Sequence, residues 1–169
     1  MSMSTTKRVK RLQKYLHEDE LDGFIITHPI NIWYVSGFAS SAGILLIIPE
    51  EAHLFTDFRY ITQAQQEVKS ALGGFEVHKS TDNLTTTLCE FIKDRKLHKV
   101  GFEAHHLSCD AHRDLKNRLK DIRLVQRRQV VENLRMINDS GELKLIKKAV
   151  ALSDAAFQHI LPFIKPQVK

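Results

Sequence analysis

The alternation of helix-like and strand-like apolar patterns along this 169-residue chain constrains its fold more than any other feature. Short apolar runs typical of buried strands occur at 24–26, 44–48, 53–56, 75–77, 99–102 and 122–125. Amphipathic helical patterns lie between them or flank them, at 9–17, 59–69, 84–92 and 108–119. Regular alternation of this kind predicts a layered α/β domain with a mostly parallel sheet.

One connection in this pattern predicts an antiparallel pair. The apolar runs at 44–48 and 53–56 are separated only by a short polar turn at 49–51, which is typical of a hairpin. The expected fold class is therefore an αβα domain whose mixed, mostly parallel sheet contains one hairpin. We assign this domain to residues 7–128, after a polar start at 1–6 that is expected to be disordered.

The carboxy-terminal segment, 129–169, has a different character. After a short helical turn, Asp139 and Glu142 fit a capping box for a long helix. The apolar positions of that helix have little left to cover in a domain that already has several helices. We therefore expect 129–169 to be a linker and a connector helix that leads to a domain absent from this sequence.

The charge balance raises the question of a nucleic-acid partner. The chain has 25 Lys and Arg residues against 20 Asp and Glu residues, a formal net charge of +5. The basic residues are spread over several helical patterns instead of one patch, and no nucleic-acid-binding motif is present, so no nucleic-acid partner is expected. The chain has no apolar run long enough to span a membrane and no signal-like start, and its two cysteines form no disulfide framework. These features predict a cytoplasmic protein with no membrane partner.

A local cluster of possible metal ligands, His105, His106, Cys109 and His112, lies between the strand at 99–102 and the following helix. Zinc takes nitrogen and sulfur ligands, but the cluster lacks the spacing of a complete tetrahedral site. A polar strand-to-helix loop is the favoured interpretation, and whether His105, Cys109 and His112 bind anything stays open. Glu103, at the end of the strand, is expected to be a hydrogen-bonding residue and not an acid or base.

Three stretches of the chain form one pattern when they are taken together in this order. The first covers residues 28–38 and 40–43, His-Pro-Ile-Asn-Ile-Trp-Tyr-Val-Ser-Gly-Phe and then Ser-Ser-Ala-Gly. The second is Leu-Phe-Thr-Asp-Phe-Arg-Tyr at 54–60, and the third is Leu-Arg-Met-Ile-Asn-Asp at 134–139 with matching positions as far as 157. Together they resemble the amino-terminal domain of the creatinase/prolidase/aminopeptidase P family of metallopeptidases. One departure occurs at Gln167, where the family commonly has a glycine.

The resemblance implies an αβα amino-terminal domain joined to a catalytic pita-bread domain. That second domain binds two divalent metal ions, manganese, zinc or cobalt, and cleaves the peptide bond before proline. This chain is therefore expected to be the non-catalytic, metal-free part of a cytoplasmic, dimeric Xaa-Pro aminopeptidase or dipeptidase. Two alternatives remain open at this point: the matching domain of a creatinase, and a free-standing binding module with the same fold.

The resemblance also points to residues near the substrate or at the subunit interface. Asn31, Trp33, Tyr34 and Phe38 match an aromatic loop that reaches the neighbouring subunit's active site, although packing in the core or an interface is the alternative for Trp33 and Tyr34. Asp57 and Arg59 have two interpretations: Arg59 faces the cleft and meets a carboxylate, or Asp57 caps a helix and pairs with Arg59. The second is favoured because capping is a common use of aspartate at such a position.

Overall fold

The computed structural model describes residues 5–70 and 74–164. The described residues fall into two compact units, one that ends at Met136 and one that begins at Ile137. The start of the chain, 1–6, was expected to be disordered. Residues 1–4 lie outside the described residues, and Thr5 and Thr6 form the first turn of a helix. Pro166 and Gln167 also lie outside the described residues.

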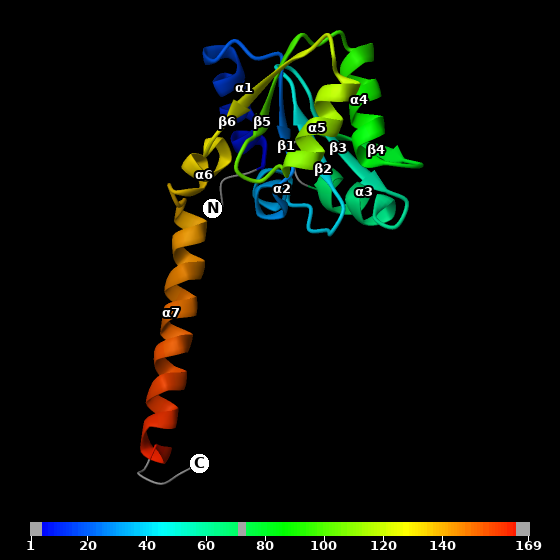
Figure 1. Ribbon diagram of the computed structural model, residues 1–169. Helices are drawn as coiled ribbons and strands as arrows, with labels where there is room; N and C mark the ends of the chain where they lie inside the picture. Colours follow the sequence, from blue (N-terminus) through cyan, green and yellow to red (C-terminus); the bar gives the residue numbers. More distant parts are fainter. Residues whose placement is uncertain (1–4, 71–73, 165–169) are drawn as a thin grey trace. The chain divides into compact units, whose positions relative to one another are not determined.

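The first unit alternates helices and strands in the predicted order, with one helix at 29–36 that the sequence pattern did not predict (Figure 1). Its strands are β1 (Gly23–Ile26), β2 (Ile44–Ile47), β3 (Ala52–Asp57), β4 (Phe75–Ser80), β5 (Lys99–Glu103) and β6 (Arg123–Arg127). Its helices are α1 (Thr5–Glu18), α2 (Pro29–Ser36), α3 (Ile61–Ser70), α4 (Leu84–Asp94), α5 (Cys109–Arg118) and α6 (Val130–Arg135).

The six strands form one mixed sheet in the order β4-β3-β2-β1-β5-β6. Strand β2 pairs antiparallel with both β1 and β3, while the β3–β4, β1–β5 and β5–β6 pairs are parallel. Strand β2 therefore runs against the other five, and the β2–β3 connection is the predicted hairpin. All four residues of β1 are buried, as expected for a central strand covered on both faces.

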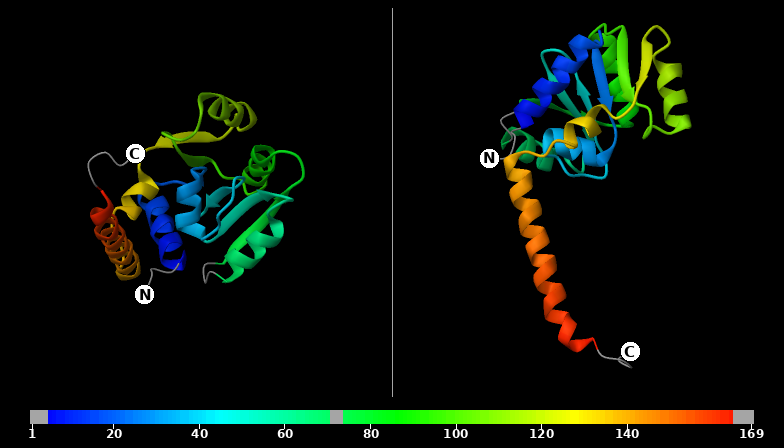
Figure 2. Two further views of the ribbon diagram at one scale, coloured as in Figure 1. Left: turned by 90° about the horizontal axis from the view of Figure 1, so that it is seen from below. Right: turned by 90° about the vertical axis from the view of Figure 1, so that its left-hand side faces the viewer.

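Helices cover both faces of this sheet (Figure 2). One apolar cluster packs residues of α1, α2, α3 and α6 against the sheet, and the other packs residues of α4 and α5. The predicted αβα fold class is confirmed. Because the apolar runs of the central strands are buried from both sides, their sequence pattern was a reliable signal.

The observed elements differ from those expected in three places. The aromatic segment at 31–35 lies in a helix, α2, whose sequence is apolar on most sides and so lacks an amphipathic period. Helix α3 begins at Ile61 instead of Arg59, because residues 58–60 form a turn. The compact unit extends to Met136, past the boundary at 128, because α6 packs on α2 and its Val131 is fully buried.

The second unit consists mainly of α7 (Ser140–Ile160), followed by a single 3-10 turn at Leu161–Phe163. Asp139 accepts hydrogen bonds from the backbone N–H groups of Gly141 and Glu142, and the Glu142 carboxylate accepts one from the backbone N–H of Asp139. The predicted capping box is thus present. In the part of the chain that the structure describes, no helix has the length and apolar character needed to cross a membrane.

Candidate functional site

The six residues singled out in the sequence gather at the carboxyl edge of the sheet. Helix α2 follows the end of β1, and the turn at 57–60 follows the end of β3. The intervening loop, 37–43, leads back into β2, which begins at this edge because it runs antiparallel to its neighbours. Open α/β sheets commonly bind ligands outside the carboxyl ends of their strands. This edge is therefore the candidate functional site.

Asn31 is fully buried and joins three elements at this edge. Its side-chain amide donates to Glu103 at the end of β5, over 2.6 Å, and to Glu132 of α6, over 2.5 Å. Its carbonyl oxygen accepts from the Arg135 guanidinium at 2.9 Å. Every polar atom of the Asn31 side chain is thus engaged within the domain, and these bonds position α2.

Glu103 and Glu132 complete this buried network. Glu103 accepts from the backbone N–H groups of Thr27 and His28 at 2.7 and 2.8 Å, so it is the hydrogen-bonding strand-end residue that the sequence predicts. Burial tends to raise the pKa of Glu132, but hydrogen bonds from Asn31 and from its own backbone, with His105 beside it, hold that pKa below its ordinary value. Both carboxylates therefore have a positioning role in this network.

Tyr34 and Phe38 belong to the core. Tyr34 is 4% exposed, donates from its hydroxyl to the Leu134 carbonyl, and carries the Arg8 guanidinium 4.0 Å from its ring centroid. Phe38 is fully buried and packs edge-to-face on Tyr60, with ring centroids 6.3 Å apart. Tyr34 therefore packs within the core of this domain. Phe38 lies with it in the same apolar cluster.

Trp33 lies on the opposite, outer side of α2. Its side chain is 57% exposed, and the nearby Ile30 is 50% exposed. Together with Pro29, Ala39 and Ser40 they line a shallow hollow of about 230 Å³. Gly37 ends the helix in a left-handed conformation (φ +80°), which turns the loop back so that residues 39 and 40 reach this hollow. Trp33 is therefore the one member of the aromatic group that is available for contact.

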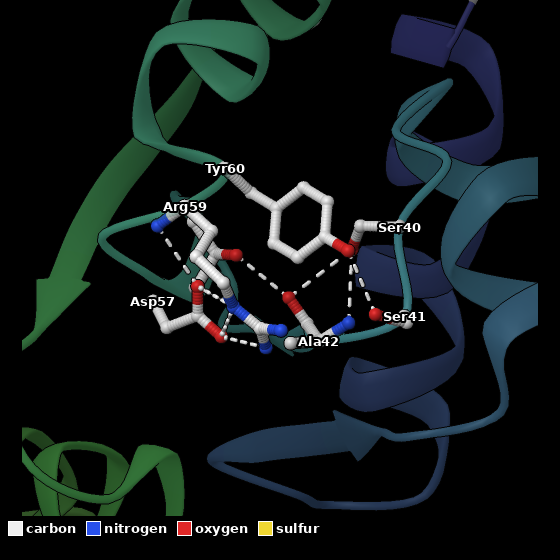
Figure 3. A network of polar contacts seen from close by, with 7 residues as sticks. Ser40, Ser41, Ala42, Asp57, Arg59 and Tyr60 are labelled. Carbon is white, nitrogen blue, oxygen red and sulfur yellow. Dashed lines mark hydrogen bonds and ion pairs between the residues drawn. The ribbon is translucent and has the colours of Figure 1, made fainter.

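Asp57 and Arg59 form a fork-like ion pair at the end of β3 (Figure 3). One Asp57 carboxylate oxygen accepts from the Arg59 backbone N–H at 3.0 Å, and the other accepts from the guanidinium at 2.6 Å. Hydrogen bonds from Arg59 lower the pKa of Asp57. Asp57 therefore closes the 57–60 turn before α3 instead of capping the helix itself. The guanidinium of Arg59, 55% exposed, is committed to this pair.

The loop at 39–42 is fastened to the same turn and to α3. Ser41 and Tyr60 share a hydrogen bond of 2.8 Å between their hydroxyl groups (Figure 3). Thr56 donates to the Ala42 carbonyl at 2.6 Å. Gln63 donates to the Ala39 carbonyl at 2.9 Å. These bonds fix the loop that lines the Trp33 hollow, so the exposed surface is pre-shaped.

The histidine and cysteine cluster after β5 does not converge on one point. His105 contacts Glu132 at 3.1 Å, the His106 ring packs on His28, and the His112 ring packs on Phe102. Cys109 is exposed. Within 5–70 and 74–164, the group of ligand-type side chains that does converge is a different one, His53, Glu76 and His78.

The sequence indicated Asn31 but not its partners in α6. Glu132 and Arg135 lie 101 and 104 positions further along, in a segment assigned to the linker. A contact over that separation leaves no periodic signal in a single sequence. The hint available in the sequence was Glu103. A carboxylate that is expected to form hydrogen bonds at the end of a strand needs donors from other parts of the chain.

Comparison with known proteins gives a consistent result. The family described as the Creatinase/Prolidase N-terminal domain matches residues 8–137. The uncharacterized peptidase YqhT of Bacillus subtilis is 32% identical over 161 residues, which cover 95% of this chain and 44% of YqhT.

Two solved structures show the same relationship. The Xaa-Pro dipeptidase from Bacillus anthracis superposes with a TM-score of 0.89 and 31% identity, over 97% of this chain and 45% of that one. The N-terminal domain of cytoplasmic peptidase PepQ from Mycobacterium tuberculosis superposes with a TM-score of 0.69 and 30% identity, over 76% of this chain and 98% of that domain. The chain thus spans less than half the length of YqhT and of the Bacillus anthracis enzyme.

Proposed function

The chain belongs to the creatinase/prolidase N-terminal domain family, and from that membership we propose that it serves as the non-catalytic amino-terminal domain of an Xaa-Pro aminopeptidase or dipeptidase. The observation that carries this proposal is a match along nearly the whole chain to relatives more than twice as long. In this proposal the remaining part of the protein supplies the catalytic domain, which cleaves the peptide bond before proline.

The catalytic metal ions belong, in this proposal, to that other domain. The family resemblance implies a set of two aspartates, one histidine and two glutamates. The converging group in the described part of this chain has one carboxylate and two histidines, so it does not fit that set. In this proposal the residues of this chain therefore hold none of the catalytic metal ions.

We propose that this domain contributes to the substrate pocket and the subunit interface of a homodimer through Trp33. An exposed indole over a pre-shaped apolar hollow is a suitable surface for the compact apolar ring of a proline residue. Placed against the metal site of a neighbouring subunit, the same surface would also exclude water. The buried Asn31 network supports this role because it holds α2, and with it Trp33, in one orientation.

Helix α7 supports the proposal of a further domain in the same protein. None of its residues is buried, although Leu143, Ile146, Val150, Phe157 and Ile160 repeat at helical spacing. Such an apolar stripe is stabilised when another surface covers it. We assign that surface to the catalytic domain. A cytoplasmic location is part of the same proposal, supported by the cytoplasmic peptidase among the structural relatives.

The decisive experiment compares two products of the gene. The full reading frame and the 169-residue chain are purified and assayed with an Xaa-Pro dipeptide and an Xaa-Pro-Xaa tripeptide in the presence of Mn²⁺. We expect hydrolysis by the longer product alone, since it would contain the catalytic domain. Hydrolysis by the 169-residue chain would refute the proposal. A stop codon directly after Lys169 would favour the free-standing binding module.

The same assay tests whether Trp33 contacts the proline ring of the substrate. In the full protein, Trp33→Ala should raise KM about 2–10-fold, because one aromatic contact to the proline ring is lost. Trp33→Phe retains an aromatic face and should keep most of the activity. Equal kinetics for Trp33→Ala and the unaltered enzyme would show that this surface lies away from the substrate.

A further inference from the structure

A second cluster lies far along the sheet from the Asn31 network, where β3 pairs with the edge strand β4. His53 stands opposite Glu76 in this parallel register, and Phe55 stands opposite His78. Side chains two apart on a strand share a face, so His53, Glu76 and His78 project from the same side of the sheet. They are the group of ligand-type side chains that converges among the described residues.

The separations within this cluster suit a single metal ion. The Nδ1 atom of His53 lies 3.1 Å from the Nε2 atom of His78 and 3.5 Å from a carboxylate oxygen of Glu76. The Nε2 atom of His78 lies 3.9 Å from the other oxygen of Glu76. Ligands on a tetrahedral Zn²⁺ ion, at bond lengths of roughly 2.0–2.2 Å, are about 3.3–3.5 Å apart. A cation can therefore be placed between these atoms with only small side-chain adjustments.

Glu51 lies beside the other ring nitrogen of His53. Its carboxylate is 3.0 Å from the Nε2 atom of His53 and is itself held by the Arg95 guanidinium at 2.8 Å. The Nδ1 atom of the same ring faces His78 and Glu76. A carboxylate near the second ring nitrogen is a common neighbour of metal-binding histidines.

The two imidazole rings are held in place by aromatic neighbours. The His78 ring stacks on Phe55 with centroids 4.7 Å apart, and both histidine rings pack against Phe91. Side chains locked by packing need little further ordering when an ion binds.

The cluster is also open to solvent on one side. His53 is fully buried, whereas the side chains of His78 and Glu76 are 20% and 60% exposed. An ion can therefore enter from the edge of the sheet, and a water molecule can occupy the fourth position. Two histidines and one carboxylate with an open position form a ligand set typical of Zn²⁺.

We propose that His53, Glu76 and His78 form a Zn²⁺-binding site that clips the edge strand β4 to β3. This site is separate from the catalytic metals assigned to the absent domain, and it revises the expectation that this chain holds no metal. The sequence signal was weak, because the two histidines are 25 positions apart and only the Glu76–His78 pair has strand spacing. The competing interpretation of the same geometry is a hydrogen bond between two histidines with no ion.

Calorimetric titration of the metal-free 169-residue chain with Zn²⁺ tests the site. We expect one equivalent to bind at pH 7.5, and Co²⁺ in its place to give the visible absorption of a tetrahedral complex. The variant His78→Phe preserves the ring packing and Glu76→Gln preserves the shape of an exposed side chain, and each should weaken Zn²⁺ binding by more than about tenfold. Circular dichroism confirms that both variants remain folded.

The matched control is His112→Phe, because His112 also packs against a phenylalanine ring, at 5.1 Å, but lies outside the cluster. Its Zn²⁺ affinity should equal that of the unaltered chain. Equal affinity in His78→Phe and Glu76→Gln would place the bound ion elsewhere and overturn the proposal. An absence of Zn²⁺ binding by the unaltered chain would overturn it in favour of the hydrogen-bonded histidine pair.

Discussion

At the scale of single residues, the candidate site separates into residues that hold the surface and one that presents it. Asn31, Tyr34 and Phe38 are buried, and Asp57 and Arg59 neutralise each other, whereas the Trp33 side chain is exposed. A sequence motif does not distinguish these positions from one another. A residue that positions other groups and a residue that contacts a ligand can each require one particular amino acid. The three-dimensional structure distinguishes them by burial and by hydrogen-bond partners.

Asn31→Ala is the substitution that tests the buried network. Removing the amide leaves Glu103, Glu132 and Arg135 without one of their hydrogen bonds inside the protein. Buried polar groups that lose a partner are costly, so we expect the free energy of unfolding to fall by about 2–4 kcal/mol. Urea denaturation followed by far-ultraviolet circular dichroism measures this change.

Asn133→Ala is the control for this experiment. Asn133 lies on the same helix as Glu132 but is exposed, so its substitution should change the free energy of unfolding by less than about 0.5 kcal/mol. Similar losses in the two variants would mean that the Asn31 contacts contribute little to stability.

At the scale of helices and strands, the sequence predicted the elements whose patterns are set by local burial. All six strands were found, because central strands are apolar on both faces and their ends carry turn residues. Helix α2 was not assigned, since five of its eight residues are buried and its apolar positions surround the axis instead of following one face. Contacts between residues far apart in the sequence, such as those of α6 with α2 or of His53 with His78, cannot be predicted from the local spacing of apolar residues.

The capping box of α7 gives a prediction at this scale. Asp139→Ala removes the acceptor for two backbone N–H groups, and we expect a loss of about 0.5–2 kcal/mol in the stability of the first helical turn. Hydrogen exchange measured by NMR should show faster exchange at Gly141 and Glu142. Asp154→Ala, in the middle of the same helix, should leave those two amides unchanged, and equal acceleration in both variants would contradict the assignment.

At the scale of the whole molecule, the position of the domain boundary decides which truncations fold. The compact unit includes α6, whose Val131 is fully buried and whose Leu134 carbonyl accepts from the Tyr34 hydroxyl. The sequence placed the boundary at 128, where the alternation of strands and helices ends. Tertiary packing extends the unit to Met136.

Two truncated chains measure this difference. A chain of residues 1–136 should unfold with a free energy within about 1 kcal/mol of the full 169 residues, because no residue of α7 is buried. A chain of residues 1–128 should lose about 3–5 kcal/mol, since it gives up the buried Val131 and breaks the Asn31 network. Equal stability of the two truncations in urea would show that α6 does not belong to the folded unit.

The contact between α2 and α6 has one further consequence. Glu132 and Arg135 bond to Asn31 on the inner side of α2, Trp33 is carried on its outer side, and α7 begins five residues after Arg135. The hydrogen bonds that hold Trp33 in its orientation are therefore made by the last helix of the compact unit. Asn31, together with the Tyr34 hydroxyl that donates to Leu134, couples the exposed indole to α6.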